Sequence, residues 1–182
     1  VLISDEGVDQ LITEISQINA LYELELKLGS ADGITRKSSN TLDKIFKCIS
    51  LTNFKIALNK LPNLTHDCVQ ILFTGIPSFV SLEILRLDLS SNSQIDDIDI
   101  TILASGIRQL KKLREFSLDN CSKITDLGIL MLSISLRGVR SLVSIQLILK
   151  NCLSNITRFA IDVFKTRMIH NWQLTELNIQ FP

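Results

Sequence analysis

LREFSLDNCSKITDLGILML, residues 113–132, contains the two patterns that decide the fold. If Leu113 is position one, Phe116 and Leu118 occupy positions four and six, and side chains two residues apart point to the same face of a strand. A polar turn follows, and Thr125 then opens an apolar pattern with helical spacing. The stretch therefore predicts one strand, one turn and one helix.

The strand pattern returns along the whole chain. Leucines equivalent to Leu113 stand 29 to 32 residues apart, at Leu21, Leu51, Leu82, Leu142 and Leu174. Positions four, six and eight after each of these leucines are apolar everywhere except at Asn120. A fixed period of this size indicates a stacked-repeat architecture, in which each repeat contacts its neighbours.

A second apolar pattern lies between the strands, with the spacing zero, three, four and seven that is typical of one helix face. It begins at Val8, Leu42, Val69, Ile100, Leu127 and Ile156. We expect the hydroxyl groups of four residues to cap helix starts. These residues are Ser4, Thr65, Thr125 and Ser154.

One strand and one helix of this length cannot enclose a core, so successive units must pack side by side. The strands then form a parallel sheet, and the helices cover one of its faces. A helix is about 10 Å wide, whereas neighbouring strands are about 4.8 Å apart, so the stack must curve with the strands inside. We predict an α/β horseshoe segment with a curved parallel sheet on the concave face and helices on the convex face.

These repeats resemble leucine-rich repeats, and the period of about thirty with full helices is similar to the ribonuclease-inhibitor-like subclass. Cys121 through Gly128, which reads CSKITDLG, is similar to the cysteine-containing variant of F-box leucine-rich-repeat proteins. The resemblance covers nearly the whole chain and implies a right-handed leucine-rich-repeat solenoid. We therefore expect residues 1–182 to form a single leucine-rich-repeat domain of about six repeats.

The composition argues against two classes of partner. With 19 basic and 19 acidic residues the chain is neutral, whereas a nucleic-acid scaffold needs clustered Lys and Arg. The most apolar run, residues 127–136, is interrupted by serines and is too short to span a bilayer. We predict no nucleic-acid partner and no membrane insertion. Neither end has a polar cap, so we expect an excerpt of a longer array whose ends are continued by further repeats or capped by a partner.

The cysteines and histidines give no sign of catalysis. Cys48, Cys68, Cys121 and Cys152 contain no C-x-x-C pair. We interpret them as small reduced residues of a cytoplasmic protein, with a metal site or a disulfide as the alternative. The two histidines, His66 and His170, stand alone, without a recognisable nucleophile, phosphate loop or dinucleotide motif. We expect no enzymatic activity, no cofactor and no bound metal.

Residues at positions three, five and seven of each strand face away from the core and are the candidate partner-binding residues. Two of them, Ile84 and Ile148, are apolar and are candidates for anchoring a contact. The predicted set is Glu23, Glu25, Lys27, Asn53, Lys55, Ile84, Arg86, Asp88, Glu115, Ser117, Asp119, Gln146, Ile148 and Asn178.

Two pairs of like charges are predicted to be lateral neighbours on this face. Lys55 should lie beside Arg86, and Asp88 beside Asp119, which costs some tenths of a kcal/mol for each pair. A partner of complementary charge would relieve both pairs. Alternatively, Arg86 reaches Asp88 or Asp119 in a solvated ladder of charges.

The sequence thus favours a non-enzymatic protein–protein interaction module, a scaffold that binds through its curved surface as part of a larger protein or assembly. One alternative is the substrate-recognition repeat domain of an F-box-type ubiquitin ligase, which the Cys121–Gly128 turn suggests. Another is a regulator of a GTPase on the same scaffold, which would need a projecting loop such as residues 29–40.

Overall fold

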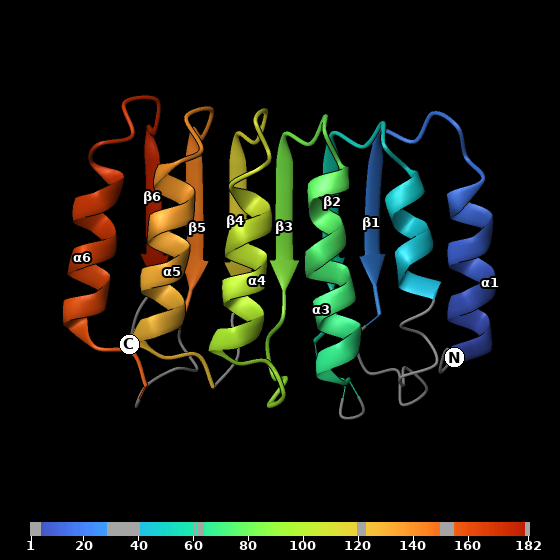
Figure 1. Cartoon of the computed structure of the whole chain (residues 1–182), viewed down its shortest axis with the longest axis horizontal. Coiled ribbons are helices and arrows are strands. Elements are labelled where there is room, and N and C mark those ends of the chain that lie inside the picture. Colours follow the sequence, from blue (N-terminus) through green and yellow to red (C-terminus); the bar gives the residue numbers. More distant parts are fainter. Residues whose placement is uncertain are drawn as a thin grey trace.

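The computed structural model describes residues 5–28, 41–59, 61, 64–119, 123–149 and 155–180. Six strands form one parallel sheet in the order of the sequence, and the helices cover one of its faces (Figure 1). The α/β class and the parallel sheet predicted from the sequence are confirmed. The strands are β1 (Glu23–Lys27), β2 (Asn53–Ala57), β3 (Ile84–Asp88), β4 (Glu115–Asp119), β5 (Ser144–Ile148) and β6 (Glu176–Gln180).

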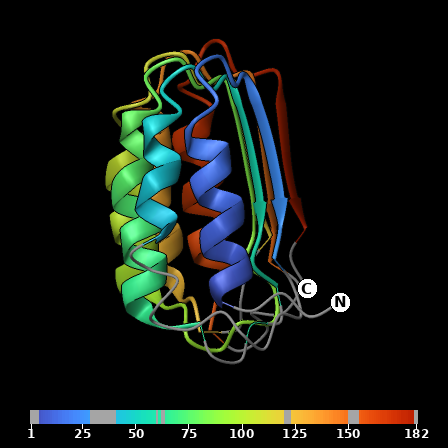
Figure 2. The same ribbon diagram turned by 90° about the vertical axis from the view of Figure 1, so that its right-hand side faces the viewer.

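Five α-helices and two short 3-10 helices lie between the described strands or before the first. Figure 2 looks along the row of strands and shows α1 and α6 set further toward the strand side than α3, so the row bends with its helices outside. The helices are α1 (Asp5–Ser16), η1 (Asp43–Lys47), α3 (His66–Gly75), η2 (Ile76–Ser78), α4 (Asp97–Ile107), α5 (Asp126–Arg137) and α6 (Arg158–Met168).

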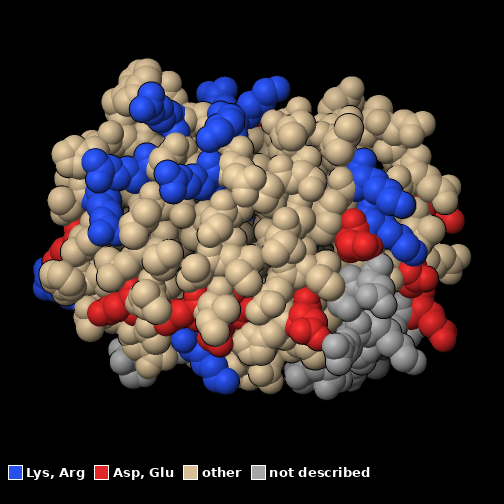
Figure 3. All heavy atoms as spheres, viewed as in Figure 1, with Lys and Arg blue, Asp and Glu red and all other residues tan. Residues whose placement is uncertain are grey.

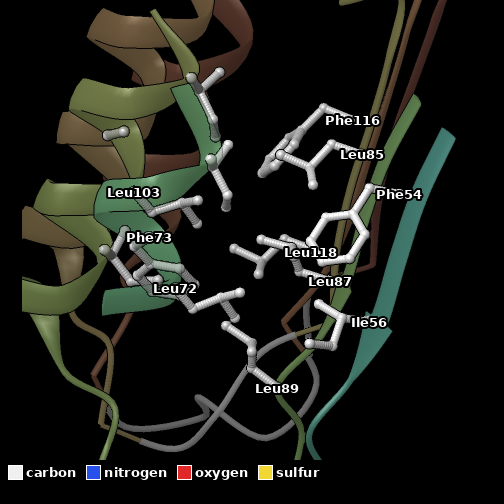
Figure 4. Packing of buried hydrophobic residues seen from close by; sticks show 14 of the residues in the cluster. Phe54, Ile56, Leu72, Phe73, Leu85, Leu87, Leu89, Leu103, Phe116 and Leu118 are labelled. Carbon is white, nitrogen blue, oxygen red and sulfur yellow. The ribbon is translucent and has the colours of Figure 1, made fainter. Parts of the chain in front are cut away.

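The strands pair in the register that the repeat predicts, with equivalent positions side by side from β1 to β6. Positions four and six are buried from β1 to β5, and in β6 Leu177 and Ile179 are half-buried at the sheet edge. Figure 4 shows Phe54, Leu85 and Phe116 of the sheet pointing toward the helix layer. Opposite them lie the helix residues Leu72, Phe73 and Leu103.

Position eight is also buried in the described units, at Leu28, Leu58, Leu89 and Leu149. Asn120 and Phe181, which hold this position in the other two units, lie outside the described residues. The prediction for the strands is therefore confirmed wherever the structure describes them.

The predicted helix stripes are confirmed in α3 and α4 and wrong in α5, and the stripe in α6 is right at Ile156 and Ala160 but wrong at Phe159. Leu127 is 57% exposed and Phe159 is 69% exposed, whereas Ile129 and Ile161 face the core. Both helices carry enough apolar residues for two frames to fit the helical spacing. Packing selects the frame that keeps a constant distance from the following strand. The core residues in that frame are Val69, Ile100, Ile129 and Ile161.

The stripes predicted for the first two units are confirmed in part. In α1, Val8 and Ile12 are buried and Leu11 is exposed. In the second unit a short 3-10 helix, η1, stands where an α-helical stripe was predicted. Ile45 of η1 is buried but Ile49 is 60% exposed, because the chain leaves the helix at Cys48 and turns toward β2.

The predicted helix caps have mixed outcomes. Thr125 caps α5 through its hydroxyl oxygen, which accepts a hydrogen bond from the Leu127 N–H at 3.2 Å. Thr65 occupies the cap position of α3 without a capping hydrogen bond from its side chain. The cap of α6 is Thr157, so the prediction that α6 begins at Ser154 is wrong. Ser4 and Ser154 lie outside the described residues.

Replacing the buried Leu118 by Ala should lower the free energy of unfolding by about 2–5 kcal/mol, because it removes core contacts and leaves a cavity. Ser117→Ala is the matched control, since this half-buried neighbour faces the opposite side of β4 and should cost less than about 0.5 kcal/mol. Urea unfolding measures both. Equal losses would contradict the assigned facing of the strand.

Candidate partner-binding face

The face of the sheet away from the helices is hollowed, and most of the predicted partner-binding residues surround the hollow. Each of the predicted residues is exposed or half-buried, as their positions in the repeat require. The hollow has a volume of 290 Å³. Predicted residues that line it are Glu25, Lys27, Lys55, Arg86, Asp88, Ser117, Asp119 and Ile148. We call this surface the free sheet face.

The two like-charged pairs on this face are confirmed as lateral neighbours. Lys55 pairs with Arg86 across β2 and β3, and Asp88 pairs with Asp119 across β3 and β4. The alternative in which Arg86 reaches either aspartate is wrong. Its Nη2 instead lies 3.0 Å from Oε2 of Glu115, which holds position three of the neighbouring strand β4.

Asp88 has a structural task that its position in the strand did not predict. Its Oδ1 accepts hydrogen bonds from the N–H and the hydroxyl of Ser90, at 3.0 and 2.6 Å. Its Oδ2 accepts one from Nδ2 of Asn59, at 3.2 Å. Asp88 therefore holds the turn after β3 and the turn after β2 together. It has a role in the fold in addition to any role in binding a partner.

Cations dominate the part of the hollow near β1 and β2. The Lys27 ammonium lies 2.7 Å from Oε1 of Glu25, and this hydrogen bond lowers the pKa of Glu25 and raises that of Lys27. The charges of Lys27, Lys55 and Arg86 lower the pKa of Glu25 further. The full lining is nevertheless balanced, because three cations face three carboxylates, and Lys55 is the cation there that forms no ion pair with the described residues.

Two polar groups on this face lack a partner among the described residues. Lys55 forms no ion pair or hydrogen bond with them. Oδ1 of Asn53, on the same strand, is buried without a hydrogen-bond donor. A buried acceptor without a donor costs about 1–3 kcal/mol, but the Asn53 oxygen has almost no surface that a ligand could reach. Lys55 is therefore the group that an anionic ligand would satisfy.

The remaining predicted residues form a mixed border. Ile148 lines the hollow beside β4, and Ile84 is half-buried at the first residue of β3. The Ser117 hydroxyl donates weakly to Oε1 of Gln146, at 3.5 Å. Glu23 and Asn178 are exposed on β1 and β6 and lie outside the hollow. The hollow is thus centred on β1 to β4 rather than spread over the whole sheet.

At the N-terminal ends of the helices, side chains join successive units through contacts that the sequence did not predict. Asp97, at the start of α4, accepts hydrogen bonds from the hydroxyl of Thr125 and from the N–H groups of Thr125 and Gly128, the latter two at 2.9 and 3.1 Å. Asp126 binds the N–H and hydroxyl of Thr157 in the next unit, at 2.6 and 2.7 Å. A Cβ on Gly128 would lie 2.5 Å from Oδ1 of Asp97, so this contact requires glycine there.

His66 also lies at the N-terminal end of a helix, α3, and it is not an isolated residue. Its Nδ1 lies 2.9 Å from Oδ2 of the fully buried Asp99, and these two residues together with Asp96 have the spacing of metal ligands. The carboxylates already have donors, however. Oδ2 of Asp99 accepts from the Asp96 N–H and Oδ1 from Gln70, while Asp96 caps α4. The group therefore forms a helix-capping network.

Cys48 and Cys68 are buried in the core and form no disulfide. Burial raises the pKa of the Cys48 thiol, because the charged thiolate loses its hydration. Cys121 and Cys152 lie outside the described residues, as do residues 29–40 and part of the Cys121–Gly128 turn. The F-box and GTPase-regulator alternatives rest on those segments and stay predictions.

No protein-family model matches this sequence, and no curated protein matches it. Among the helices in the described part of the chain, none combines the length and apolar character that crossing a bilayer requires. The properties of this face are therefore inferred from its own geometry.

Asp97→Ala should lower the free energy of unfolding by about 1–3 kcal/mol, because the N–H groups at the start of α5 lose their acceptor. Asp162→Ala, at an exposed position in α6, is the control and should cost less than about 0.5 kcal/mol. Thermal unfolding monitored by circular dichroism compares the two. If Asp97→Ala lowers the free energy of unfolding no more than Asp162→Ala does, the contacts of Asp97 do not couple the units.

Proposed function

We propose that this chain is a segment of a leucine-rich-repeat solenoid that binds a partner protein through the free sheet face. Three features support the solenoid: the repeat of about thirty residues, the sequential parallel strands, and the helices confined to one side. The hydrogen bonds from Asp97 to Thr125 and from Asp126 to Thr157 also support it, since they join two successive pairs of units through equivalent residues.

The observation that carries the binding proposal is the hollow on the free sheet face, with Lys55 in its lining. Lys55 lies beside Glu25 in the strand register but forms no ion pair within the described residues. The apolar side chain of Ile148 borders the same hollow. A protein segment that presents a carboxylate and an apolar side chain would match both residues.

The chemistry of the hollow favours binding over catalysis. Arg86 and Glu115 neutralise each other, and Asp88 is committed to its turn. The only interaction described for the Ser117 hydroxyl is with the Gln146 amide, which is not a general base. We therefore propose a non-enzymatic role. Cys48 and Cys68 form no disulfide, which supports our further proposal that the protein works in a reducing, intracellular compartment.

Lys55→Glu should weaken partner capture roughly tenfold, because an attraction becomes a repulsion worth about 1.4 kcal/mol or more. The test is affinity capture from a lysate of the native organism, with captured proteins quantified by mass spectrometry. Lys47→Glu is the control, since it changes the net charge equally at an exposed site in η1, off this face.

The expected result is a set of proteins that the wild type and Lys47→Glu retain and Lys55→Glu loses. Thermal unfolding should confirm that Lys55→Glu remains folded, since the new carboxylate lies beside Glu25. Equal capture by all three folded proteins would refute binding through the free sheet face.

A further inference from the structure

Charged side chains are segregated along the helices. The first turns of α3, α4 and α5 each carry aspartate, whereas Lys and Arg gather where α4, α5 and α6 end, seen as the blue area at the upper left of Figure 3. In the same view carboxylates form a red band toward the opposite end of the helices. The chain has no net charge, so placement rather than composition produces the basic area.

Within the basic area lies an open hollow of 540 Å³, which we call the basic hollow. It is built from three successive units and lies away from the free sheet face. None of the described residues that line it is acidic. The side chains that define it are Arg108, Lys111, Ile134, Arg137, Arg140 and Arg167.

Helix capping does not account for this concentration of cations. A cation near a helix C-terminus contributes about 0.3–1 kcal/mol through the helix dipole, yet α1 and α3 have no basic residue in their last turn. Lys111 and Arg140 lie beyond the helices, in the turns that lead to β4 and β5. The Lys111 ammonium donates to the carbonyl oxygen of Arg108 at 3.3 Å, on the exposed surface.

The cations of the hollow lack anionic partners within the described part of the chain. Arg167 is held in place, because its Nη1 donates to the Leu130 carbonyl at 3.3 Å and to the Ser133 hydroxyl at 2.6 Å. No ion pair joins any cation of the hollow to a described carboxylate. Like charges placed together repel, and an anionic ligand would remove that cost.

The chemistry of the hollow favours an acidic protein segment over nucleic acid or a membrane. Arginine binds carboxylates through two parallel hydrogen bonds, and four of the five cations are arginines. Ile134 lies among them and is exposed, which offers an apolar contact that a phosphate backbone would not use. A neutral chain lacks the general positive charge typical of nucleic-acid binding, and a flat membrane surface does not fill a hollow.

A second hollow adjoins the first and extends the surface. It is lined by Lys112, Ser141 and Trp172, and residues 112 and 141 directly follow two residues of the basic hollow. The Trp172 side chain is 79% exposed. Tryptophan and arginine are the residues most often found at energetic hot spots of protein interfaces, so this neighbour strengthens the argument for a protein ligand.

We propose that the basic hollow at the ends of α4, α5 and α6 is a second docking surface, which binds an acidic segment of a partner protein with an apolar residue among its carboxylates. The carboxylates pair with Arg137, Arg140 and Arg108, and the apolar side chain rests on Ile134. This surface is separate from the free sheet face, so the two can be occupied independently.

The test uses a fluorescent peptide in which glutamates flank one leucine, with binding measured by fluorescence anisotropy. The double variant Arg137→Glu, Arg140→Glu should lose roughly tenfold or more in affinity, because two attractions become repulsions. Both residues are exposed and make no side-chain hydrogen bond or ion pair with the described residues. The matched control is Lys47→Glu, Arg158→Glu, with the same charge change at exposed sites remote from the hollow, and it should stay within about twofold of wild type.

Three further arms identify the ligand class. A peptide with glutamine in place of glutamate should not bind, and Lys55→Glu should bind the acidic peptide as the wild type does. The Arg137→Gln, Arg140→Gln variant removes the two charges without reversing them and should also bind the acidic peptide more weakly. It keeps the proposal testable if the charge-reversed protein does not fold.

Several outcomes would overturn the proposal. One is a wild type that fails to bind the acidic peptide, and another is an equal loss in the remote control. Tighter binding of the wild type to phosphatidylserine vesicles or to single-stranded RNA, lost in the Arg137 and Arg140 variants, would assign the hollow to those ligands instead. Loss of peptide binding in Lys55→Glu would mean that the peptide occupies the free sheet face.

Discussion

The strands of this protein bury their apolar side chains against neighbouring strands and against the helices behind the sheet. Phe54, Leu85 and Phe116 stand side by side in the sheet register and point into one continuous core. A single strand and helix would leave most of these apolar side chains in water. Each large side chain would then lose about 1.5–3 kcal/mol of stabilisation from burial. The whole arrangement depends on this sharing of the core between neighbours.

The same constraint explains where binding surfaces can form. Because alternate residues of every strand are committed to the core, the others lie on an uncovered face and vary without loss of packing. The helix ends behave differently. Aspartates at the helix starts link consecutive units, whereas the cations at the ends of α4, α5 and α6 have no such duty except for Arg167. The starts of these helices thus carry contacts between units, whereas their ends carry the cations for which we propose a role in binding.

The sequence predicts the strands better than the helices, and the reason is physical. In a strand a shift by one residue exchanges the buried and exposed faces, so Leu87 and Arg86 leave only one frame. In α5 the apolar residues surround most of the helix, and only packing against α4 and the sheet selects Ile129 over Leu127. The contacts of Asp97 and Asp126 were predictable in principle, since each aspartate stands 16 residues before the leucine of the following strand, Leu113 and Leu142. The pairing of Arg86 with Glu115 depends on side-chain conformation, so it does not follow from residue spacing. The two hollows depend on the three-dimensional arrangement of several units, so they do not follow from spacing either.

The most direct test of the shared core is hydrogen exchange measured by mass spectrometry after Phe116→Ala, a change at a buried position in the fourth of the six strands. If neighbouring units stabilise one another, backbone amides of β3 and β5 will exchange faster together with those of β4. Faster exchange confined to β4 and its own helix, with β3 and β5 unchanged, would contradict the account.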